Sequence, residues 1–173
     1  MKQGKIDLNK AEAVWGRLGG EEGVERLLNG ESEVITRCHS IDSDANPEIP
    51  MGWGVTIAEH RTIGQLELGV RKLHQYQHDK QKTGEIFRLH DLRKELENKI
   101  VPNANALDYF FKNQQLIPEH WKGKTIYFFG TIYRDLLGNL YVRYLVWKDE
   151  CWCLGTDSLN NTYHDNIFAL IIL

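Results

Sequence analysis

The sequence predicts an α+β fold, because helical periodicity is confined to the N-terminal and central parts while the last third is typical of strands. Apolar residues recur at helical spacing near the N-terminus, whereas β-branched and aromatic residues dominate residues 125–133 and 140–147. At 173 residues, the chain is long enough to bury a hydrophobic core without a disulfide or a metal. We expect an N-terminal helical hairpin, a central mixed segment with short helices, and a C-terminal antiparallel β-meander packed on helices.

Residues 1–30 predict two short helices. The apolar positions at helical spacing are Leu8, Ala11, Val14, Trp15 and Leu18. Gly19 and Gly20 can end the first helix, and Glu21 suits the positive N-terminal end of a second one. We expect residues 1–30 to be a helical segment and residues 31–173 an α+β domain, the two together forming one compact unit.

The central segment is less regular than either end of the chain. Residues 33–38 and 53–59 fit strands, with a turn-rich loop between them. Residues 70–81 fit a helix or an edge strand equally well, so periodicity leaves both open. We expect short helices at residues 89–96, where leucines repeat, and from Asn103, which can act as an N-cap.

The last third of the chain predicts an antiparallel meander. Residues 125–133 and 140–147 form a hairpin around the turn residues 135–139. Residues 151–154 add a third strand, and residues 167–172 close the sheet as a fourth.

Strand alternation predicts an aromatic face on this hairpin. Its members are Tyr127, Phe129, Tyr133, Tyr141, Arg143 and Trp147. When exposed, such a face stacks unpaired bases, a sugar ring or a protein partner. The alternative is that helices or a second sheet cover it, with the phenol groups hydrogen-bonded at its rim. We take it as the candidate binding surface, with a protein partner or a homo-oligomer as its occupant.

An acidic motif, Asp42-x-Asp44-x-Asn46, opens like a calcium-binding loop. An EF-hand next requires a glycine and a bidentate glutamate, but Pro47 and Trp53 stand at those positions. The two carboxylates are weak candidates for a Mg²⁺ site, which needs only oxygen ligands. A turn capped by Asx side chains is the interpretation that we favour.

The cysteines raise two further possibilities. Cys151 and Cys153 lie on one face of a strand and are weak candidates for a soft-metal site with Cys38, His39 or His164. Structural zinc usually shows two ligand pairs, so we favour buried, inert thiols. A Cys38 nucleophile would need His39 as its base, yet neighbours on a strand point to opposite faces. We expect neither a metal nor a cofactor.

Charge and hydropathy restrict the partners and the location. A formal charge of −3 with both signs interspersed argues against binding to nucleic acid. The longest apolar run, residues 167–173, is too short to cross a membrane, and the N-terminus lacks the apolar core of a signal peptide. Three cysteines suit reduced thiols rather than a disulfide framework. We expect a cytoplasmic protein.

Several sequence pieces carry a resemblance to a family. They are LGGEEGV at 18–24, IDSDANP at 41–47, LRKEL at 92–96, LIPE and WKGK within 116–124, and GTIYR and GNLYVRYL within 130–145. In these pieces the chain resembles an uncharacterised family of small hypothetical proteins from uncultured bacteria with reduced genomes. The resemblance covers nearly the whole chain and implies a bacterial origin, but it implies no activity, cofactor or fold.

Three classes of function stay open at this point. Phosphate loops, dinucleotide fingerprints, nucleophile elbows and zinc-protease motifs are all absent from the sequence. This absence favours a non-enzymatic interaction module that uses the aromatic strand face. The alternatives are a small hydrolase or metal-assisted enzyme using Asp42 and Asp44 or Cys38 and His39, and a binder of single-stranded nucleic acid.

Overall fold

The computed structural model has both helices and strands, which confirms the α+β class. It describes residues 8–30, 39–50, 52, 54–68 and 73–173. The chain divides into two compact units, Met1–Arg37 and Cys38–Leu173. The division lies close to the boundary expected after residue 30, and the joining of both parts into one compact unit stays a prediction.

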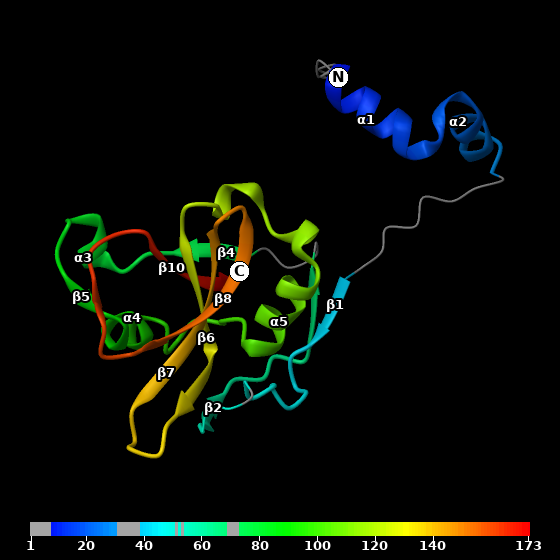
Figure 1. Cartoon of the computed structure of the whole chain (residues 1–173). Coiled ribbons are helices and arrows are strands. Elements are labelled where there is room, and N and C mark those ends of the chain that lie inside the picture. The colour runs from blue at the N-terminus through cyan, green and yellow to red at the C-terminus, as the bar shows by residue number, and fades with distance from the viewer. Residues whose placement is uncertain (1–7, 31–38, 51, 53, 69–72) are drawn as a thin grey trace. The chain divides into compact units, whose positions relative to one another are not determined.

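The first unit contains the two helices that the sequence predicts, α1 (Leu8–Leu18) and α2 (Gly20–Leu28) (Figure 1). Gly19 lies between them and Gly20 begins α2, with φ angles of 89° and 71°. This left-handed backbone is accessible to glycine because glycine has no Cβ. Glu21 and Glu22 lie in the first turn of α2, where the helix dipole favours negative charge.

A six-stranded sheet forms the centre of the second unit (Figure 1). Its order is β4 (Leu73–Tyr76), β10 (Ile167–Ile172), β6 (Thr125–Arg134), β7 (Leu140–Lys148) and β8 (Cys151–Ser158), while β2 (Thr56–His60) pairs with β6. Strands β6, β7 and β8 form the expected antiparallel hairpins. Asp149 and Glu150 connect β7 to β8 with φ angles of 50° and 60°, the conformation that suits a tight hairpin.

The position of strand β10 in the sheet differs from the predicted meander, in which it would close the sheet as a fourth strand. It does not follow β8 but lies between β4 and β6, parallel to β6 and antiparallel to β4. Its sequence, IFALII, is apolar on both faces, and four of its side chains, those of Ile167, Ala169, Leu170 and Ile172, are buried. Leu170 and Ile172 lie in one core cluster and Ile167 and Ala169 in another, so both faces of β10 are covered, while β4 and β6 pair with its two edges.

The central segment contains short elements. They are β1 (His39–Asp42) paired with β3 (Gln65–Leu68), α3 (Asp79–Lys82), β5 (Phe87–Arg88) paired with β9 (Thr162–Tyr163), α4 (Leu89–Glu95), α5 (Ala104–Lys112), and the 3₁₀ turns η1 (Gln114–Leu116) and η2 (Glu119–Trp121). Within residues 70–81 the structure has both a strand, β4, and the short helix α3. The strand expected at 33–38 lies outside the described residues, and the one expected at 53–59 is β2. The Asn103 cap is confirmed, since its side chain accepts a hydrogen bond from the Asn105 backbone N–H.

An irregularity in the pairing of β6 with β7 decides which side chains share a face. Tyr127 pairs with Tyr144 and Ile132 pairs with Val142, so β6 covers five residue steps where β7 covers two. Because side chains alternate along a strand, an odd difference exchanges the faces of β6 beyond the irregularity. Tyr127 and Ile132 therefore belong to the same core cluster although they are an odd number of residues apart.

Helices cover the two faces of the sheet. Phe110 of α5 lies in one core cluster with Ile126 and Phe128 of β6. Leu92 of α4 lies in a second cluster with Phe129, which points to the opposite face of the same strand. The central strands β6 and β10 are thus buried, with α5 packed on one face of β6 and α4 on the other.

Gly155 on β8 provides a test of this sheet. It lies opposite Tyr144, and a Cβ at Gly155 would come within 2.2 Å of the Tyr144 ring. We expect Gly155→Ala to lower the free energy of unfolding by about 2 kcal/mol or more, because packed strands tolerate added volume poorly. Chemical denaturation measures the loss.

Two controls accompany this variant. Gly16→Ala in α1 meets no atom within 4 Å and should not destabilise the protein. In a Tyr144→Val background, Gly155→Ala should cost much less, because the ring is gone. An equal cost in both backgrounds would contradict the packing of Tyr144 over Gly155.

Candidate functional site

The six residues of the predicted aromatic face do not share a face. Tyr127, Phe129 and Tyr133 are at most 2% exposed, Arg143 is buried, and Tyr141 and Trp147 are half-buried. The irregularity in β6 divides these residues among different core clusters. The prediction of one shared binding face is therefore wrong, and the alternative of a covered sheet describes these side chains.

Trp147 is one of the side chains that neighbouring residues partly cover. Its ring packs edge-on against Trp152, with 5.3 Å between centroids, and the Lys122 ammonium lies 4.1 Å from its centroid. An amine over an indole face is a favourable cation–π arrangement. Trp147 therefore contributes to the packing between β7, β8 and the segment after α5.

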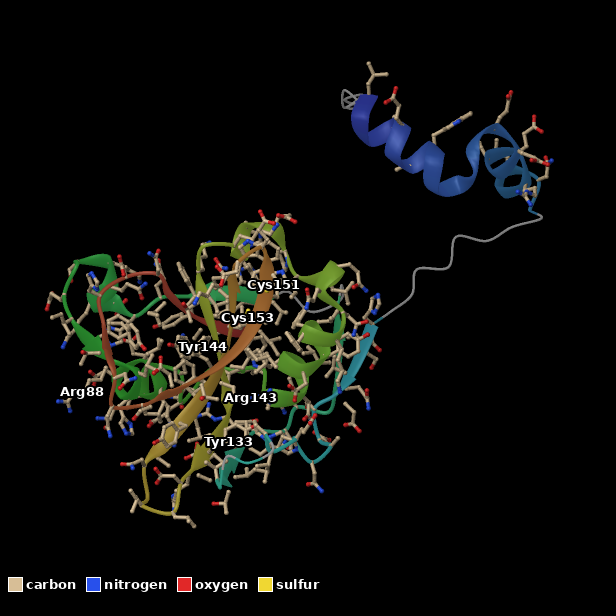
Figure 2. The ribbon with its side chains drawn as sticks, in the orientation of Figure 1. Arg88, Tyr133, Arg143, Tyr144, Cys151 and Cys153 are labelled. Carbon is tan, nitrogen blue, oxygen red and sulfur yellow. The ribbon has the colours of Figure 1, made fainter. Side chains whose placement is uncertain are left out.

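Arg143 of β7, which Figure 2 labels, forms a largely covered ion pair with Asp108 of α5, whose side chain is 15% exposed. The two guanidinium nitrogens donate to the two carboxylate oxygens over 2.7 and 3.1 Å, a bidentate geometry. Burial alone would lower the pKa of Arg143, but Asp108 and Tyr133 raise it above its usual value. With Glu48 and Lys112, the pair lines a cavity of about 310 Å³.

A second polar cluster surrounds Asp157 on β8, where the buried Tyr127 reaches partly exposed groups. The Tyr127 hydroxyl donates to Asp157 Oδ2 over 2.7 Å, and Tyr163 and Asn161 donate to the same carboxylate. Burial, and then the hydrogen bond to Asp157, raises the pKa of Tyr127. This cluster satisfies a tyrosine hydroxyl inside the sheet and joins β6 to the β8–β9 turn.

The Asp42 motif is a capped turn, as the sequence favoured. Asp42 Oδ1 accepts from the Asp44 backbone N–H over 3.0 Å, and Asp44 Oδ1 accepts from the Gly64 backbone N–H over 2.9 Å. The Ser43 hydroxyl donates to the Gly64 carbonyl over 2.8 Å. These carboxylates thus hold the loop against the start of β3.

The thiols differ from the expected inert core cysteines. Cys151 is exposed, Cys153 is partly exposed, and their sulfurs are 3.5 Å apart. The expectation that both are buried is therefore wrong. Cys38 lies outside the described residues, so the alternative of a Cys38 nucleophile with His39 as its base, which the sequence disfavours, stays untested. Among the described residues, no group of three or more His, Cys, Asp or Glu side chains is placed to hold a metal ion.

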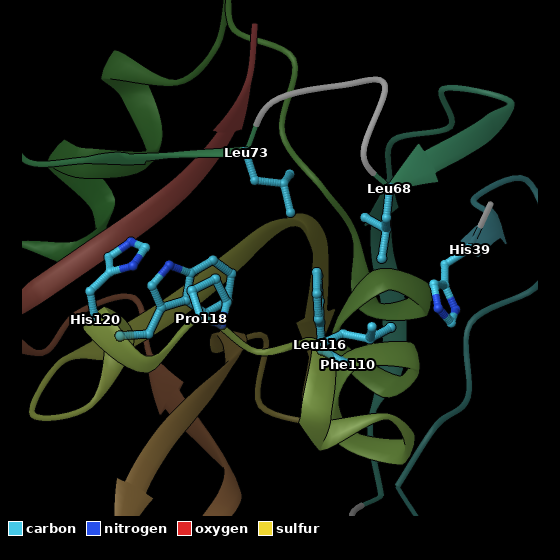
Figure 3. Close-up of a pocket in the computed structure, with 8 residues that line it drawn as sticks. His39, Leu68, Leu73, Phe110, Leu116, Pro118 and His120 are labelled. Carbon is cyan, nitrogen blue, oxygen red and sulfur yellow. The ribbon is translucent and has the colours of Figure 1, made fainter. Parts of the chain in front are cut away.

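A cavity with largely apolar walls lies beside α5 (Figure 3). It measures about 340 Å³ and is lined by His39, Leu68, Leu73, Phe110, Leu116, Pro118, His120 and Trp121. Trp121 and Phe110 pack edge-on with 5.6 Å between centroids and form its aromatic wall. Local sequence patterns do not predict this pocket, because its walls come from β1, β3, β4, α5 and the turns after α5. The only local signal was an amphipathic helix followed by Pro118 and Trp121.

Two histidines give the pocket its polar groups. His39 Nδ1 lies 2.8 Å from the Tyr109 hydroxyl, which holds the imidazole in place. His120 is exposed on η2. Figure 3 shows His39 and His120 on opposite sides of the pocket, separated by Leu116 and Phe110.

In comparisons with known proteins, no family model, no curated protein and no solved structure matches the chain. The resemblance to a bacterial family accordingly stays a prediction. Within the described part of the chain, no helix is both long and apolar enough to span a membrane.

The Arg143–Asp108 pair should be important for stability. We expect Arg143→Leu to cost about 2 kcal/mol or more, because it leaves the largely covered Asp108 carboxylate without its bidentate partner. Arg143→Leu combined with Asp108→Leu should recover much of that loss, since no unpaired charge remains. Lys82→Met, which breaks an exposed pair with Asp79, is the matched control and should leave denaturation unchanged.

Alkaline pH should destabilise the protein through its tyrosines. Burial and then Glu95 raise the pKa of Tyr76 from 10.0 to about 12, and burial also raises the pKa of Tyr127. The folded state therefore holds these protons more tightly than the unfolded state. This contribution is fully present below pH 10 and is lost as the pH rises toward 12.

Denaturation at stepped pH, read beside tyrosinate absorbance, tests this expectation. Tyr76→Phe should make the loss between pH 10 and 12 shallower, because it removes one of the linked protons. Ionisation of every tyrosine near pH 10 in the folded protein would contradict it.

Proposed function

We propose that this protein is a non-enzymatic binding module whose ligand site is the apolar pocket beside α5. The observation that carries the proposal is a cavity of about 340 Å³ with aromatic and aliphatic walls and few polar groups. That volume is at the lower end of the range for ligand pockets, so it suits one compact group rather than a large cofactor. The occupant that we propose is an aromatic or branched apolar side chain of a protein partner.

The pocket is held open by well-anchored elements. Asn103 caps α5, and its side-chain amide also donates to the Ser43 and Arg61 carbonyls over 2.8 and 3.0 Å. The helix that carries Phe110 and Tyr109 is thereby attached to the loop after β1 and to the end of β2. A pre-organised pocket loses little conformational entropy on binding, which favours recognition of a partner.

The histidines support binding more than catalysis. General acid and base groups must reach the same reacting atoms, but His39 and His120 lie on opposite sides of the pocket (Figure 3). Each histidine supplies instead a polar group at the rim. A partner segment with an apolar anchor and flanking hydrogen-bonding groups fits such a site.

Acetylated amino-acid amides provide a defined probe of this pocket. We expect the tryptophan and leucine amides to shift backbone NMR signals of Leu68, Phe110 and Leu116 with a Kd on the order of 10 mM, since burial of one side chain supplies about 2–3 kcal/mol. The alanine amide should have no effect at the same concentration, because it buries too little apolar surface.

A variant that fills the pocket separates specific from general binding. Leu116→Trp should abolish the shifts without lowering stability, because the larger side chain occupies the cavity. Leu136→Trp is the matched control, since Leu136 is 92% exposed on the turn between β6 and β7. Shifts that survive Leu116→Trp, or that follow Leu136→Trp equally, would contradict the proposed site.

A further inference from the structure

Cys151, which is exposed, and Cys153, which is partly exposed, form a pair of thiols at the start of β8. Figure 2 shows both on this strand, and their sulfurs are 3.5 Å apart. Trp152 between them points to the opposite face, where it is 5% exposed and packs edge-on against Trp147. Because Trp152 is anchored in the core, strand alternation holds both thiols outward on the other face.

The position of the pair in the sheet leaves it room to move. Among the described strands, β8 is the last of the sheet and pairs only with β7. Cys151 follows directly after the tight turn of Asp149 and Glu150, and its thiol lies 3.3 Å from the Lys148 carbonyl. An edge strand beside a turn can adjust its backbone with less loss of pairing than a central strand.

The two thiols interact in the reduced state. The pKa of Cys151 is raised, first by its hydrogen bond with Cys153 and then by burial and the charges of Cys153 and Asp149. Cys151 therefore keeps its proton to a higher pH than an isolated thiol. This behaviour is typical of two sulfurs close enough to share a proton.

We propose that Cys151 and Cys153 are a reversible dithiol–disulfide site that exchanges with small-molecule disulfides such as glutathione disulfide. One cysteine thiolate attacks a sulfur of the reagent, forms a mixed disulfide and releases one glutathione thiolate. The second cysteine loses its proton to solvent and attacks the protein sulfur, which forms the Cys151–Cys153 bond and releases the second glutathione. Two protein thiols are thereby oxidised, and one glutathione disulfide is reduced to two thiols.

Strand geometry explains why the bond should be reversible. Residues two apart on a strand are separated by about 6.7 Å between Cα atoms, near the upper limit for a disulfide of about 6.8 Å. The bond thus forms only with a small adjustment of the strand and stores strain. Strained, exposed disulfides are readily reduced, as expected of a redox-responsive site rather than of a structural cross-link.

The experiment follows the masses of the intact protein in a Cys38→Ser background after incubation with glutathione disulfide and an acid quench. We expect one product that has lost two hydrogens and carries no glutathione, and that returns to the dithiol on addition of reduced glutathione. In the same background, Cys151→Ser and Cys153→Ser should each stop at a single glutathione adduct, because the resolving thiol is missing.

Other products would overturn the proposal. Two adducts on the chain that retains both cysteines would mean that the thiols react independently. A chain that stays fully reduced, or a disulfide that reduced glutathione does not open, would exclude a reversible site. Peptide mapping of the wild-type protein gives the same assignment should Cys38→Ser fail to fold, because Cys151 and Cys153 are distant from Cys38 in the sequence.

Discussion

The second unit depends on the pairing and burial of strand β6. This strand pairs with β2, β7 and β10, and the side chains from Ile126 to Tyr133 along it are buried. A strand covered on both faces cannot alternate apolar and polar residues, which explains its sequence, TIYFFGTIYR. Its irregular register is equally important, because it determines which aromatic rings lie under α4 and which under α5. Gly130 is part of the same constraint, since a Cβ there would lie 2.8 Å from the Asn103 backbone.

The polar groups buried around this strand are paired with one another. Arg143 is matched by Asp108, the Tyr127 hydroxyl by Asp157, and the Asn103 amide by backbone carbonyls. Each pairing crosses between elements that are far apart in the sequence. Such networks are costly to break and so favour one arrangement of the helices on the sheet. The shape of the apolar pocket depends on how α5 packs on the sheet, because α5 supplies one of the pocket's walls.

The pocket and the thiol pair represent different kinds of site. The pocket is formed by several elements and depends on the tertiary fold, whereas the thiol pair lies within a single strand and depends on local geometry. Trp152 belongs to the same core cluster as Phe110 and Trp121 of the pocket wall, so both sites rest on one packed core. The proposed recognition at the pocket would require rigidity, whereas the proposed exchange at the thiols would require an edge strand with some freedom.

The sequence by itself determined the local features of this protein. Periodicity and capping residues placed α1, α2, α4 and α5, residue preferences placed the hairpin of β6 and β7, and Asx turn chemistry placed the capped turn at Asp42. All of these depend on neighbours a few residues apart. Only the tertiary structure decided the parallel position of β10, the division of the aromatic residues between faces and the pocket beside α5. Those features follow from contacts between distant segments, and a change of register by an odd number of residues reverses every face that local alternation predicts.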